Sequence, residues 1–459
     1  MKSLILFKNN LRYYDNPALY YGSFSSKVLT AYIYDEVNTD KKIGGASKYW
    51  LYKSLKSLNK SLNNNLLLYK GDTIKIVENL IKKHSINNVY IEEPFLKQDI
   101  EIYDKLQNIL KKLEVSLIPY NCNLLWNPNS IYKNDLTPYK VFTPFYKKGC
   151  LLNQKQPDKP LGPPQLLNFI EIKNQTNIDD LNLISNHPWH KKLSNYWDIS
   201  EDTALEMLAD FIKTKAYDYK NGRDYPYLNK NSRLSPYIRF GLISVNRIWW
   251  ELDKIKQDKN IAHYKSELGW REFSYYLLYH FPTIQYENLQ KKFDGFKWEN
   301  SKSKFNSWKT GNTGYPIVDA GMRELWETGY IQNRVRMVVA SFLVKNLSID
   351  WRIGEKWFWD CLVDADYASN VASWQWVAGT GADAAPYFRI FNPMLQGIKF
   401  DPKGEYTLKF LPELKDVPIK FLQNPWESNI ELDYPEPIID YKNSRERALS
   451  KYSNLRKLS

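Results

Sequence analysis

The fold class follows from two short segments near the start of the chain, Ser3-Leu-Ile-Leu-Phe7 and Leu29-Thr-Ala-Tyr-Ile-Tyr34. Both are apolar and rich in strand-favouring residues, which is typical of buried β-strands. Around them the chain alternates between strand and helix patterns. This order predicts a doubly wound parallel sheet with right-handed crossovers. Further strands are predicted at 66–69, 88–91 and 115–118, and helices at 46–62, 73–83 and 99–113.

The alternation ends after about residue 120, and the chain divides into three predicted parts. Residues 1–125 form the α/β domain, and residues 126–198, rich in Pro and Asn, form a mostly irregular connector packed on the surface. Residues 199–459 carry only helical patterns and predict an all-α domain. Helices are predicted at 201–215, 244–256, 266–280, 316–327, 332–347 and 354–363, with a surface helix or frayed end at 444–459. The stretch from Asp319 to Val344 carries apolar residues all round, which indicates a helix buried at the centre of this domain.

Composition excludes several classes of protein. With 459 residues, 43% of them hydrophobic, the chain is neither disordered nor fibrous. The apolar runs are too short to span a bilayer, and the first residues do not form a signal peptide, so we expect a cytoplasmic protein without membrane contact. The three cysteines lie far apart and the five histidines show no HExxH or HxH spacing, so we expect no metal site.

The net charge of +13 leaves two interpretations open. A basic surface favours nucleic acid as a partner, whereas a composition rich in Lys, Asn, Ile and Tyr also follows from an AT-rich coding sequence. Residues 1–195 carry 27 Lys and Arg against 17 Asp and Glu, a net of +10, and residues 196–459 carry a net of +3. The excess therefore lies outside the part that carries the candidate chemistry.

That part is dense in tryptophan and in charged motifs. Eleven of the 16 Trp residues fall between Trp249 and Trp376. Buried Trp is commonly core, but such density also suits stacking on a ring ligand or on bases. Charges inside an apolar helical domain are seldom buried unless they are paired or bind a polar ligand. A salt-bridged helical core would explain any one of these segments alone. The segments are Asn231–Pro236, Ser266–Phe273, Gln332–Met337, Asp364–Trp376 and Gly379–Pro393.

Two pairs in these segments predict local geometry. Arg334 and Arg336 lie on different sides of a helix, so they cannot serve the same partner. Asp364 and Asp366 follow a predicted helix on a short turn, where they can accept hydrogen bonds from ring N–H or hydroxyl groups.

Taken together, the segments closely resemble the photolyase/cryptochrome family of flavoproteins, and within it the bacterial cyclobutane pyrimidine dimer photolyases of class I. The resemblance covers the whole chain and is strongest from about Tyr219 to Pro412, where Thr313–Asp319 and Trp374–Pro393 match almost without interruption. It implies an α/β domain, a connector and a helical domain, which agrees with the patterns. The resemblance further implies that the helical domain holds FAD.

The resemblance implies one FAD per chain, active as FADH−. Ser232 and Ser235 would donate hydrogen bonds to the flavin phosphates, Arg336 would pair with Asp364 beside the isoalloxazine ring, and Asn370 would face the flavin N5. The pocket departs from the family at two positions: Asn231 stands where Thr is usual, and Tyr264 stands where Trp is frequent. Each change keeps the polar or aromatic character of the contact. The residues that match the family's FAD pocket are Tyr219, Asn231, Ser232, Arg233, Leu234, Ser235, Tyr264, Arg271, Arg336, Asp364, Ala365, Asp366 and Asn370.

The same comparison implies a substrate cavity for a dimer flipped out of DNA. Trp270 and Trp376 would stack on the dimer, and Glu267 and Asn333 would hydrogen-bond its edges. Gln332-Asn333 stands where cavities for (6-4) photoproducts usually carry a histidine pair, which favours the cyclobutane dimer. Phosphate contacts are expected from Arg223, Arg334 and Arg389. The residues of the cavity and its rim are Arg223, Glu267, Trp270, Asn333, Arg334, Met337, Trp376, Arg389 and Gln396.

Three tryptophans, Trp374, Trp351 and Trp298, match the family's electron-transfer chain, and Glu267 and Asn370 complete the expected catalytic set. Trp326, Trp357 and Trp359 are interpreted as core. The N-terminal domain of the family often binds an antenna, a folate (methenyltetrahydrofolate) or a deazaflavin. Residues 44–50 and 92–99 line the matching region, without the Asn-Glu pair of some folate binders, so the antenna is left open.

The sequence therefore predicts a monomeric lyase that repairs cyclobutane pyrimidine dimers in DNA by electron transfer from excited reduced FAD. A cryptochrome-type photoreceptor is the alternative, and Asn370 counts against it because plant and insect cryptochromes tend to carry Asp or Cys there. A DNA-binding protein with a vestigial flavin is a third hypothesis, which intact Glu267, Asn370 and Trp374 disfavour.

Overall fold

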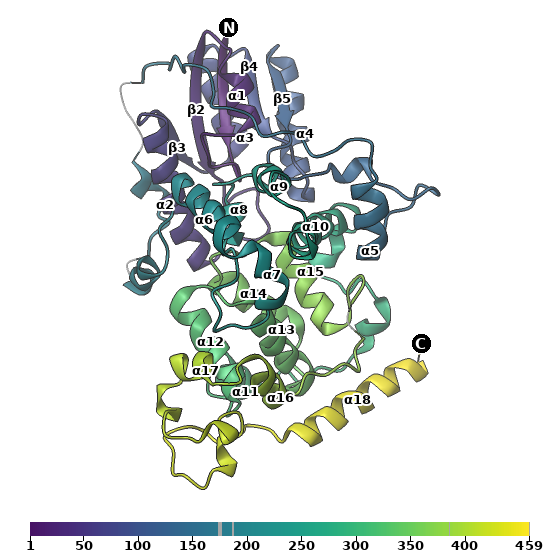
Figure 1. Ribbon diagram of the computed structural model, residues 1–459. Coiled ribbons are helices and arrows are strands. Elements are labelled where there is room, and N and C mark those ends of the chain that lie inside the picture. Colours follow the sequence, from purple (N-terminus) through teal and green to yellow (C-terminus); the bar gives the residue numbers. More distant parts are fainter. Residues whose placement is uncertain (173–176, 186–187, 385, 459) are drawn as a thin grey trace. The chain divides into compact units, whose positions relative to one another are not determined.

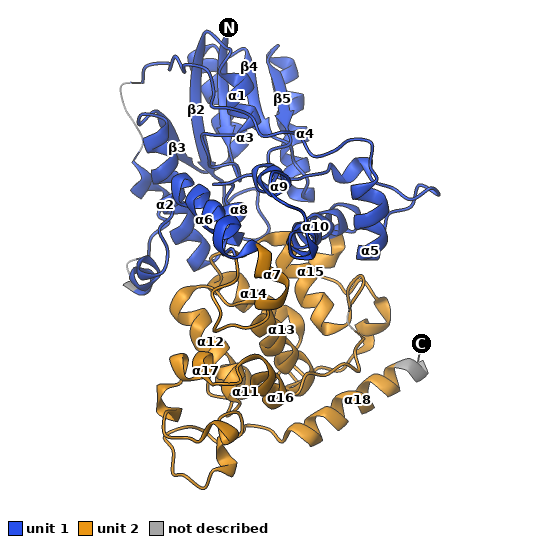
Figure 2. Cartoon of the chain, viewed as in Figure 1, with its two compact units in different colours: residues 1–216, 232–282 blue, residues 217–231, 283–459 orange. Residues whose placement is uncertain are grey.

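The computed structural model describes residues 1–172, 177–185, 188–384 and 386–458 (Figure 1). The chain folds into two compact units, which Figure 2 colours differently. Unit 1 comprises Met1–Ala216 and Ser232–Pro282, and unit 2 comprises Tyr217–Asn231 and Thr283–Ser459. The domain boundaries at residues 125 and 198 stay a prediction. Residues 173–176 and 186–187 of the predicted connector, and residue 385 of the motif at 379–393, lie outside the described residues.

Unit 1 contains a five-stranded parallel sheet in the order β3-β2-β1-β4-β5, which confirms the predicted doubly wound class. In the register, Leu4 of β1 pairs with Leu29 of β2 and with Val89 of β4. The strand order reverses between β1 and β4, the place where such sheets bind ligands. The strands are β1 (Lys2–Phe7), β2 (Lys27–Tyr34), β3 (Leu66–Lys70), β4 (Asn88–Glu92) and β5 (Ser116–Tyr120).

Helices cover both faces of this sheet, because neighbouring strand residues point to opposite sides. Leu4 belongs to a buried cluster with Val77 and Leu110 from the helices on one face. Ile5 faces the other side, where a Cβ on Gly22 would come within 2.8 Å of its side chain. The helices that alternate with the strands are α1 (Pro17–Gly22), α2 (Gly45–Ser61), α3 (Thr73–His84) and α4 (Lys97–Lys112).

The remaining helices of unit 1 pack around buried aromatic and charged residues. The indole of Trp50 on α2 meets the rings of Trp197 and Tyr237 edge-on, at centroid distances of 5.2 and 5.1 Å. Arg12 is fully buried and donates to the backbone carbonyls of Asp15, Cys122 and Gly241. These helices are α6 (Glu201–Thr214), α8 (Ser235–Arg239), α9 (Val245–Asp253) and α10 (Lys259–His280).

The predicted connector is irregular over most of its described length. Besides short 3-10 helices at Pro128–Ser130, Ile178–Leu181 and Pro188–Asn195, it contains a further helical segment that the sequence did not predict. The segment consists of α5 (Phe142–Pro144) and a π-helical turn at Phe145–Leu151. The buried ring of Phe145 packs on Phe273 and Tyr276 of α10, at centroid distances of 5.0 and 4.7 Å. The turn is therefore held by tertiary contacts, which its local sequence does not reveal.

Unit 2 is helical, and no strand occurs in its described residues. A π-helical turn at Phe342–Asn346 continues α13. The helices are α7 (Tyr219–Gly222), α11 (Lys302–Thr310), α12 (Pro316–Thr328), α13 (Asn333–Ser341), α14 (Trp351–Cys361), α15 (Tyr367–Ala378), α16 (Pro393–Phe400), α17 (Glu405–Phe410) and α18 (Tyr441–Leu458).

The separate helices predicted at 316–327 and 332–347 are confirmed as α12 and α13, so the buried apolar stretch from Asp319 to Val344 is two helices and not one. Helix α12 ends at Gly329, which adopts a left-handed conformation with φ 69°. Gln332 then caps α13, because its side chain accepts hydrogen bonds from the backbone N–H of Arg334 and Val335. The predicted gap between residues 327 and 332 contains this helix stop, and the apolar residues on both sides of it are buried as expected.

The stability of unit 1 is expected to depend on pH through Glu201. Burial raises the pKa of this carboxyl from 4.5 to about 7, although the N–H groups of Tyr13 and Tyr14 donate to it. Because the folded state then holds a proton that the unfolded state releases, the free energy of unfolding should fall as the pH rises from 4.5 to 7, by at most about 1.4 kcal/mol per unit. In urea denaturation, Glu201→Gln should flatten this dependence, whereas Glu206→Gln, an exposed control on the same helix, should not. Parallel pH curves for parent and Glu201→Gln would contradict this.

Candidate functional site

Unit 1 carries part of the predicted site on one face of α10. Tyr264, Glu267 and Arg271 are spaced i, i+3 and i+7, so they share that face. The Tyr264 hydroxyl lies 2.9 Å from Ser232 Oγ and donates to it, which brings two predicted FAD residues together. Glu267 lies 3.7 Å from the ring of His263, one turn earlier.

Two other predicted FAD residues of unit 1, Arg233 and Arg271, have side chains that contact other protein groups. Arg233 adopts a left-handed conformation, φ 54°, and its guanidinium lies 4.2 Å from the centre of the Trp197 ring. Arg271 donates to the Asn123 carbonyl at 2.8 Å and pairs with Glu272 at 3.1 Å. Burial raises the pKa of Glu272 to about 7, against the pull of Arg271 and two backbone N–H groups. The FAD contacts of Arg233 and Arg271 stay predictions.

Trp270, predicted to stack on the dimer, already stacks on one ring within unit 1. The Phe142 ring lies parallel to the indole, with centroids 3.8 Å apart, and Tyr146 stacks beyond Phe142 at 5.4 Å. Gly269 permits this approach, because a Cβ there would meet the Tyr146 ring at 2.5 Å. Sequence analysis missed Phe142, since nothing local pairs the connector with α10.

In unit 2, one ion pair joins α13 to the turn before α15. Arg336 Nη2 lies 3.0 and 2.8 Å from the two carboxylate oxygens of Asp364, and Arg336 Nε donates to the Ile331 carbonyl. Burial alone would lower the pKa of Arg336, but the Asp364 carboxylate outweighs it and the pKa rises. The predicted Arg336–Asp364 pair is therefore present in the structure.

Helix α15 follows directly and presents further predicted residues on one face. Asp366 caps it by accepting from the Ser369 N–H at 2.7 Å. Asn370 Nδ2 donates to the carboxylate of the buried Glu355, at 2.8 Å, and to its backbone carbonyl. No described residue donates to Asn370 Oδ1. Glu355 was missed by sequence analysis, because its pairing spans two helices.

Trp374 lies one turn beyond Asn370 and is buried against α14. Its ring meets Phe358 edge-on at 4.9 Å, and a Cβ on Gly354 would clash with it at 2.2 Å. Its Nε1 has no acceptor among the described residues. The close approach of Trp374 to α14 therefore requires glycine at position 354.

The other tryptophans show different environments. Trp351 is buried and its Nε1 donates to Asn288 at 2.9 Å, whereas Trp298 is half-buried against Phe296. No ring contact joins any two of Trp374, Trp351 and Trp298 in the described structure, and their electron-transfer role stays a prediction. The interpretation of Trp326 as core is wrong, because 54% of its surface is exposed. Trp359 is buried as expected and Trp357 is half-buried.

The segment before α8 lies on the N-terminus of α13 within unit 2. The side chain of Gln332 donates to the Arg223 carbonyl, and Arg334 pairs with Asp224 at 2.6 Å. The Arg223 guanidinium lies 5.4 Å from the ring centre of the buried Tyr219. Arg334 and Arg336 thus serve different partners, as their helical spacing predicted.

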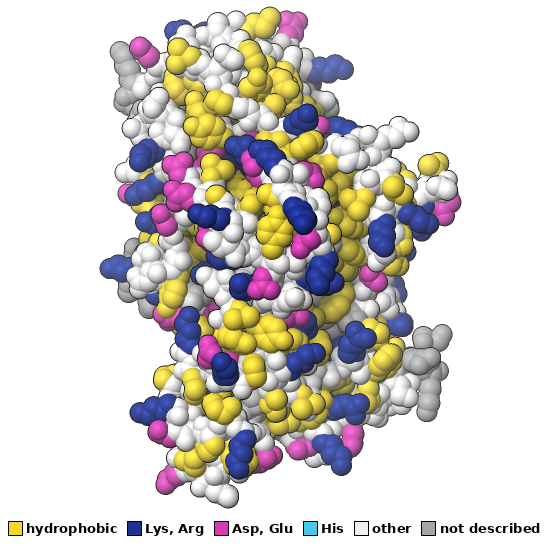
Figure 3. Space-filling model, in the orientation of Figure 1, with side chains coloured by type: hydrophobic (Ala, Val, Ile, Leu, Met, Phe, Trp, Pro, Cys, Tyr) yellow, Lys and Arg dark blue, Asp and Glu magenta, His cyan; other side chains and the backbone are white. Residues whose placement is uncertain are grey.

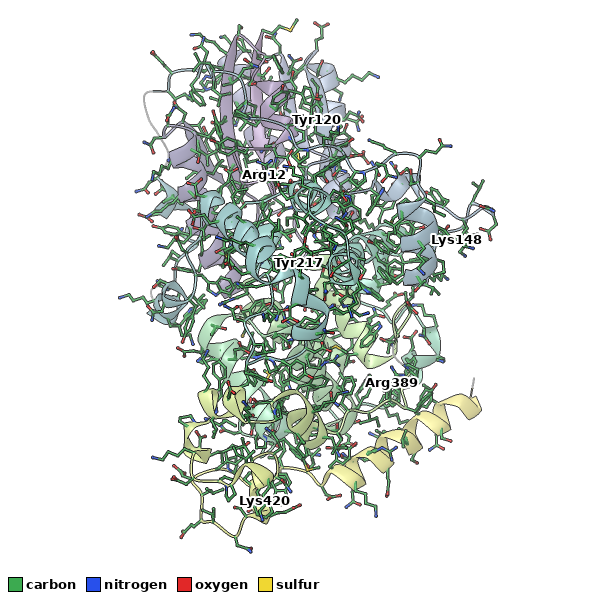
Figure 4. All side chains as sticks on the ribbon, in the orientation of Figure 1. Arg12, Tyr120, Lys148, Tyr217, Arg389 and Lys420 are labelled. Atoms are coloured by element: carbon green, nitrogen blue, oxygen red, sulfur yellow. The ribbon has the colours of Figure 1, made fainter. Side chains whose placement is uncertain are left out.

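The remaining rim residues of unit 2 vary in exposure. Arg389 is exposed on the loop between α15 and α16 and is labelled in Figure 4. Asn333 Nδ2 approaches Met337 Sδ at 3.8 Å, while Trp376 and Gln396 are half-buried. Figure 3 shows Lys and Arg side chains scattered over the visible face, with Asp and Glu among them.

The predicted antenna segments follow two strands of the sheet. Gly44 precedes α2 after β2, and Glu92 ends β4. The Glu92 carboxylate already has hydrogen-bond partners within the fold, because it accepts from the Asn9 N–H and from the side-chain amide of Asn123. Among the residues placed by the structure, no cluster of His, Cys, Asp and Glu could hold a metal ion. None of the described helices is both long and apolar enough to cross a bilayer.

The donor and acceptor set fits a flavin dinucleotide. The hydroxyls of Ser232 and Ser235 can donate to phosphate, the carboxylates of Asp364 and Asp366 can accept from hydroxyl or ring N–H groups, and Asn370 keeps an amide oxygen without a donor. The paired Arg336 and Asp364 offer both a donor and an acceptor to a flat, polar ring. The predicted FAD residues are divided between unit 1 and unit 2.

Comparison with known proteins gives consistent matches over nearly the whole chain. Residues 3–164 match the family model of DNA photolyase, and residues 264–454 match that of the FAD binding domain of DNA photolyase. A deoxyribodipyrimidine photo-lyase of Agrobacterium fabrum is 38% identical over 99% of this chain and 98% of its own. Cryptochrome-2 of Arabidopsis thaliana is 33% identical over 97% of this chain and 78% of its own.

A solved structure shows the same similarity in three dimensions. The crystal structure of a bacterial class III photolyase from Agrobacterium tumefaciens superposes with a TM-score of 0.94, at 38% identity, and covers 99% of this chain and 98% of that one. The class I assignment made from the motifs stays a prediction.

The Arg336–Asp364 and Arg334–Asp224 ion pairs are expected to differ in strength. Asp364 is 5% exposed and Arg336 24%, so Asp364→Asn leaves a largely desolvated guanidinium unpaired and should lower the free energy of unfolding by about 2–4 kcal/mol. Asp224 and Arg334 are 31% and 21% exposed, so the matched Asp224→Asn should cost less than about 1 kcal/mol. Urea denaturation of both variants tests this, and equal losses would contradict it.

Proposed function

The chain belongs to the photolyase/cryptochrome family, and on that premise we propose that it is a light-driven DNA-repair lyase whose substrate is the cyclobutane pyrimidine dimer. The observation that carries the proposal is the face of α15, where Asn370 and Trp374 follow the Arg336–Asp364 pair. An amide, an ion pair and an indole joined in this way support the proposal of a flavin that takes part in chemistry.

The cofactor of the proposed reaction is FAD. The resemblance assigns Ser232, Ser235 and Tyr264 to its phosphates and neighbouring groups, and Arg336 and Asp364 to its ring. When bound and reduced, the flavin would supply on excitation an electron to the dimer, and this electron would return after the cyclobutane ring has opened, so no net redox change would result. Asn370, held by Glu355, would fix the amide oxygen that faces the ring nitrogen.

The protein's own residues bind and orient the dimer. Trp270 stacks on Phe142 with one face and a base would stack on its other face, while Trp376 is half-buried. Each stacked base is worth about 1–3 kcal/mol. Glu267 would hydrogen-bond the polar edge of the dimer in a partly dry site, where such a bond stabilises developing charge.

The choice of cyclobutane dimers over (6-4) photoproducts rests on the residues at the start of α13. Gln332 and Asn333 occupy this position, and unit 2 contains no histidine in its whole sequence. Histidine-dependent proton transfer to a (6-4) lesion would therefore have no donor there. Asn370 likewise favours repair over cryptochrome signalling, despite the 33% identity to Cryptochrome-2.

Glu267→Gln should slow dimer splitting and leave the flavin content normal, because the variant keeps the shape of the side chain and removes its charge. The quantum yield of repair per absorbed photon measures the effect, and the flavin absorption band serves as the control. An unchanged yield would remove Glu267 from the catalytic set.

Trp374→Phe should abolish photoreduction of oxidised FAD, because the indole next to Asn370 is the proposed first electron donor. The same variant, reduced chemically beforehand, should still repair dimers. Trp359→Phe, a buried tryptophan on α14 without an assigned role, serves as the matched control and should photoreduce normally. Normal photoreduction in Trp374→Phe would contradict the assignment.

A further inference from the structure

Lys345 is an unusual buried cation in unit 2. It lies in the π-helical turn Phe342–Asn346 and is 2% exposed. No carboxylate of the described residues lies within ion-pair distance of its ammonium group. Its Nζ donates to the backbone carbonyl of Arg389 at 2.9 Å and lies 5.4 Å from the centre of the Tyr387 ring. Burying an ammonium group without a counter-charge is costly, so this arrangement calls for an explanation.

The contacts of Lys345 fix one loop, which joins α15 to α16. The loop is held at the Arg389 carbonyl by Lys345 and at the Tyr387 ring, which stacks on Tyr452 of α18 with centroids 5.0 Å apart. Between these anchors, Phe388 is 60% exposed and the Arg389 side chain faces solvent.

The same π-helical turn also anchors α18. Asn346 Nδ2 donates to Ser444 Oγ at 3.0 Å, and Arg447 donates to the Asn346 carbonyl at 3.1 Å. Turns of this kind are rare and are frequent at functional sites. Here, one turn holds both the loop and the helix that packs on it.

We propose that Lys345 is a positioning residue for DNA binding, which holds the loop between α15 and α16 so that the Arg389 side chain meets a DNA phosphate. The inference rests on the proposed function, because it requires Arg389 to contact DNA. It goes beyond that function by assigning a role to a buried residue that touches neither flavin nor DNA.

The electrostatics of the turn give this role a measurable signature. Burial, and then the nearby Arg389 charge, lower the pKa of Lys345 to about 7. A phosphate at Arg389 would offset that charge and raise the pKa again, so DNA binding should draw a proton onto Lys345. Affinity should then fall as the pH rises above 7, by at most about tenfold per pH unit.

Three other groups bear on the pH dependence near the turn. Burial raises the pKa of Tyr387, so its hydroxyl stays neutral. Arg447 on α18 pairs with Glu299 at 3.2 Å. Burial raises the pKa of Asp319 on α12 to about 6, but this carboxylate is hydrogen-bonded to Thr313, Gly314 and Tyr434 and not to the turn.

The first experiment uses the full chain without DNA and compares Lys345→Met, Lys345→Gln and Lys420→Met. Lys420 is exposed and Figure 4 shows it in a different part of unit 2 from Arg389, so its variant is a matched loss of charge. Amide exchange of residues 387–391 should be several-fold faster in Lys345→Met and unchanged in Lys420→Met. Lys345→Gln keeps a hydrogen-bond donor to the Arg389 carbonyl, so its amide exchange in this segment should stay close to that of the parent. Equal exchange in Lys345→Met and parent would overturn the anchor.

The second experiment measures affinity for a dimer-containing duplex from pH 6 to 8.5 at constant salt. Affinity of the parent and Lys420→Met should fall by about threefold to tenfold across this range, whereas Lys345→Gln, which cannot titrate, should lose this dependence. A variant that keeps the parent's pH dependence would overturn the proposal. If the parent protein binds no DNA, the proposed function is contradicted instead. The amide-exchange experiment would still show whether Lys345 holds the loop.

Discussion

The ion pair between Arg336 and Asp364 is the interaction on which the site in unit 2 depends. It joins α13 to the turn that leads into α15, so it fixes where α15 starts. Asp366 caps that helix two residues later, and the helical repeat then places Asn370 and Trp374 on one face. A partly buried ion pair of this kind fixes the relative positions of the two segments more than it adds to the free energy of unfolding, because the cost of desolvating both charges offsets most of their Coulomb attraction.

Charged and polar groups also determine which segments outside the regular elements stay in place. Arg12 gathers three backbone carbonyls, Glu272 accepts from two backbone N–H groups of the connector, and Lys345 holds the carbonyl of Arg389. Burial shifts the pKa of Glu272 and of Lys345 to about 7, in opposite directions from their usual values. Among these three anchoring groups, burial therefore shifts the pKa of Glu272 and of Lys345 toward neutral pH.

The sequence predicted the sheet almost residue by residue, because buried parallel strands are short apolar runs bounded by helices of clear period. It also predicted the Arg336–Asp364 pair, through the family resemblance. The helices predicted at 316–327 and 332–347 also allow for the break at Gly329, although the apolar pattern continues across it. The stack of Phe142 on Trp270 and the bond from Glu355 to Asn370 join segments far apart in the chain, so no local pattern could reveal them.

The most direct test of the account is light-driven repair of a defined lesion. An oligonucleotide with a single thymine cyclobutane dimer is mixed with the protein, whose flavin has been reduced chemically, and is illuminated with near-ultraviolet or blue light. Chromatography then measures the dimer that is lost and the unmodified thymine that appears. The account predicts several turnovers per protein in the light, none in the dark, and none on a (6-4) photoproduct. Flavin-loaded, reduced protein that restores no thymine under illumination would contradict it.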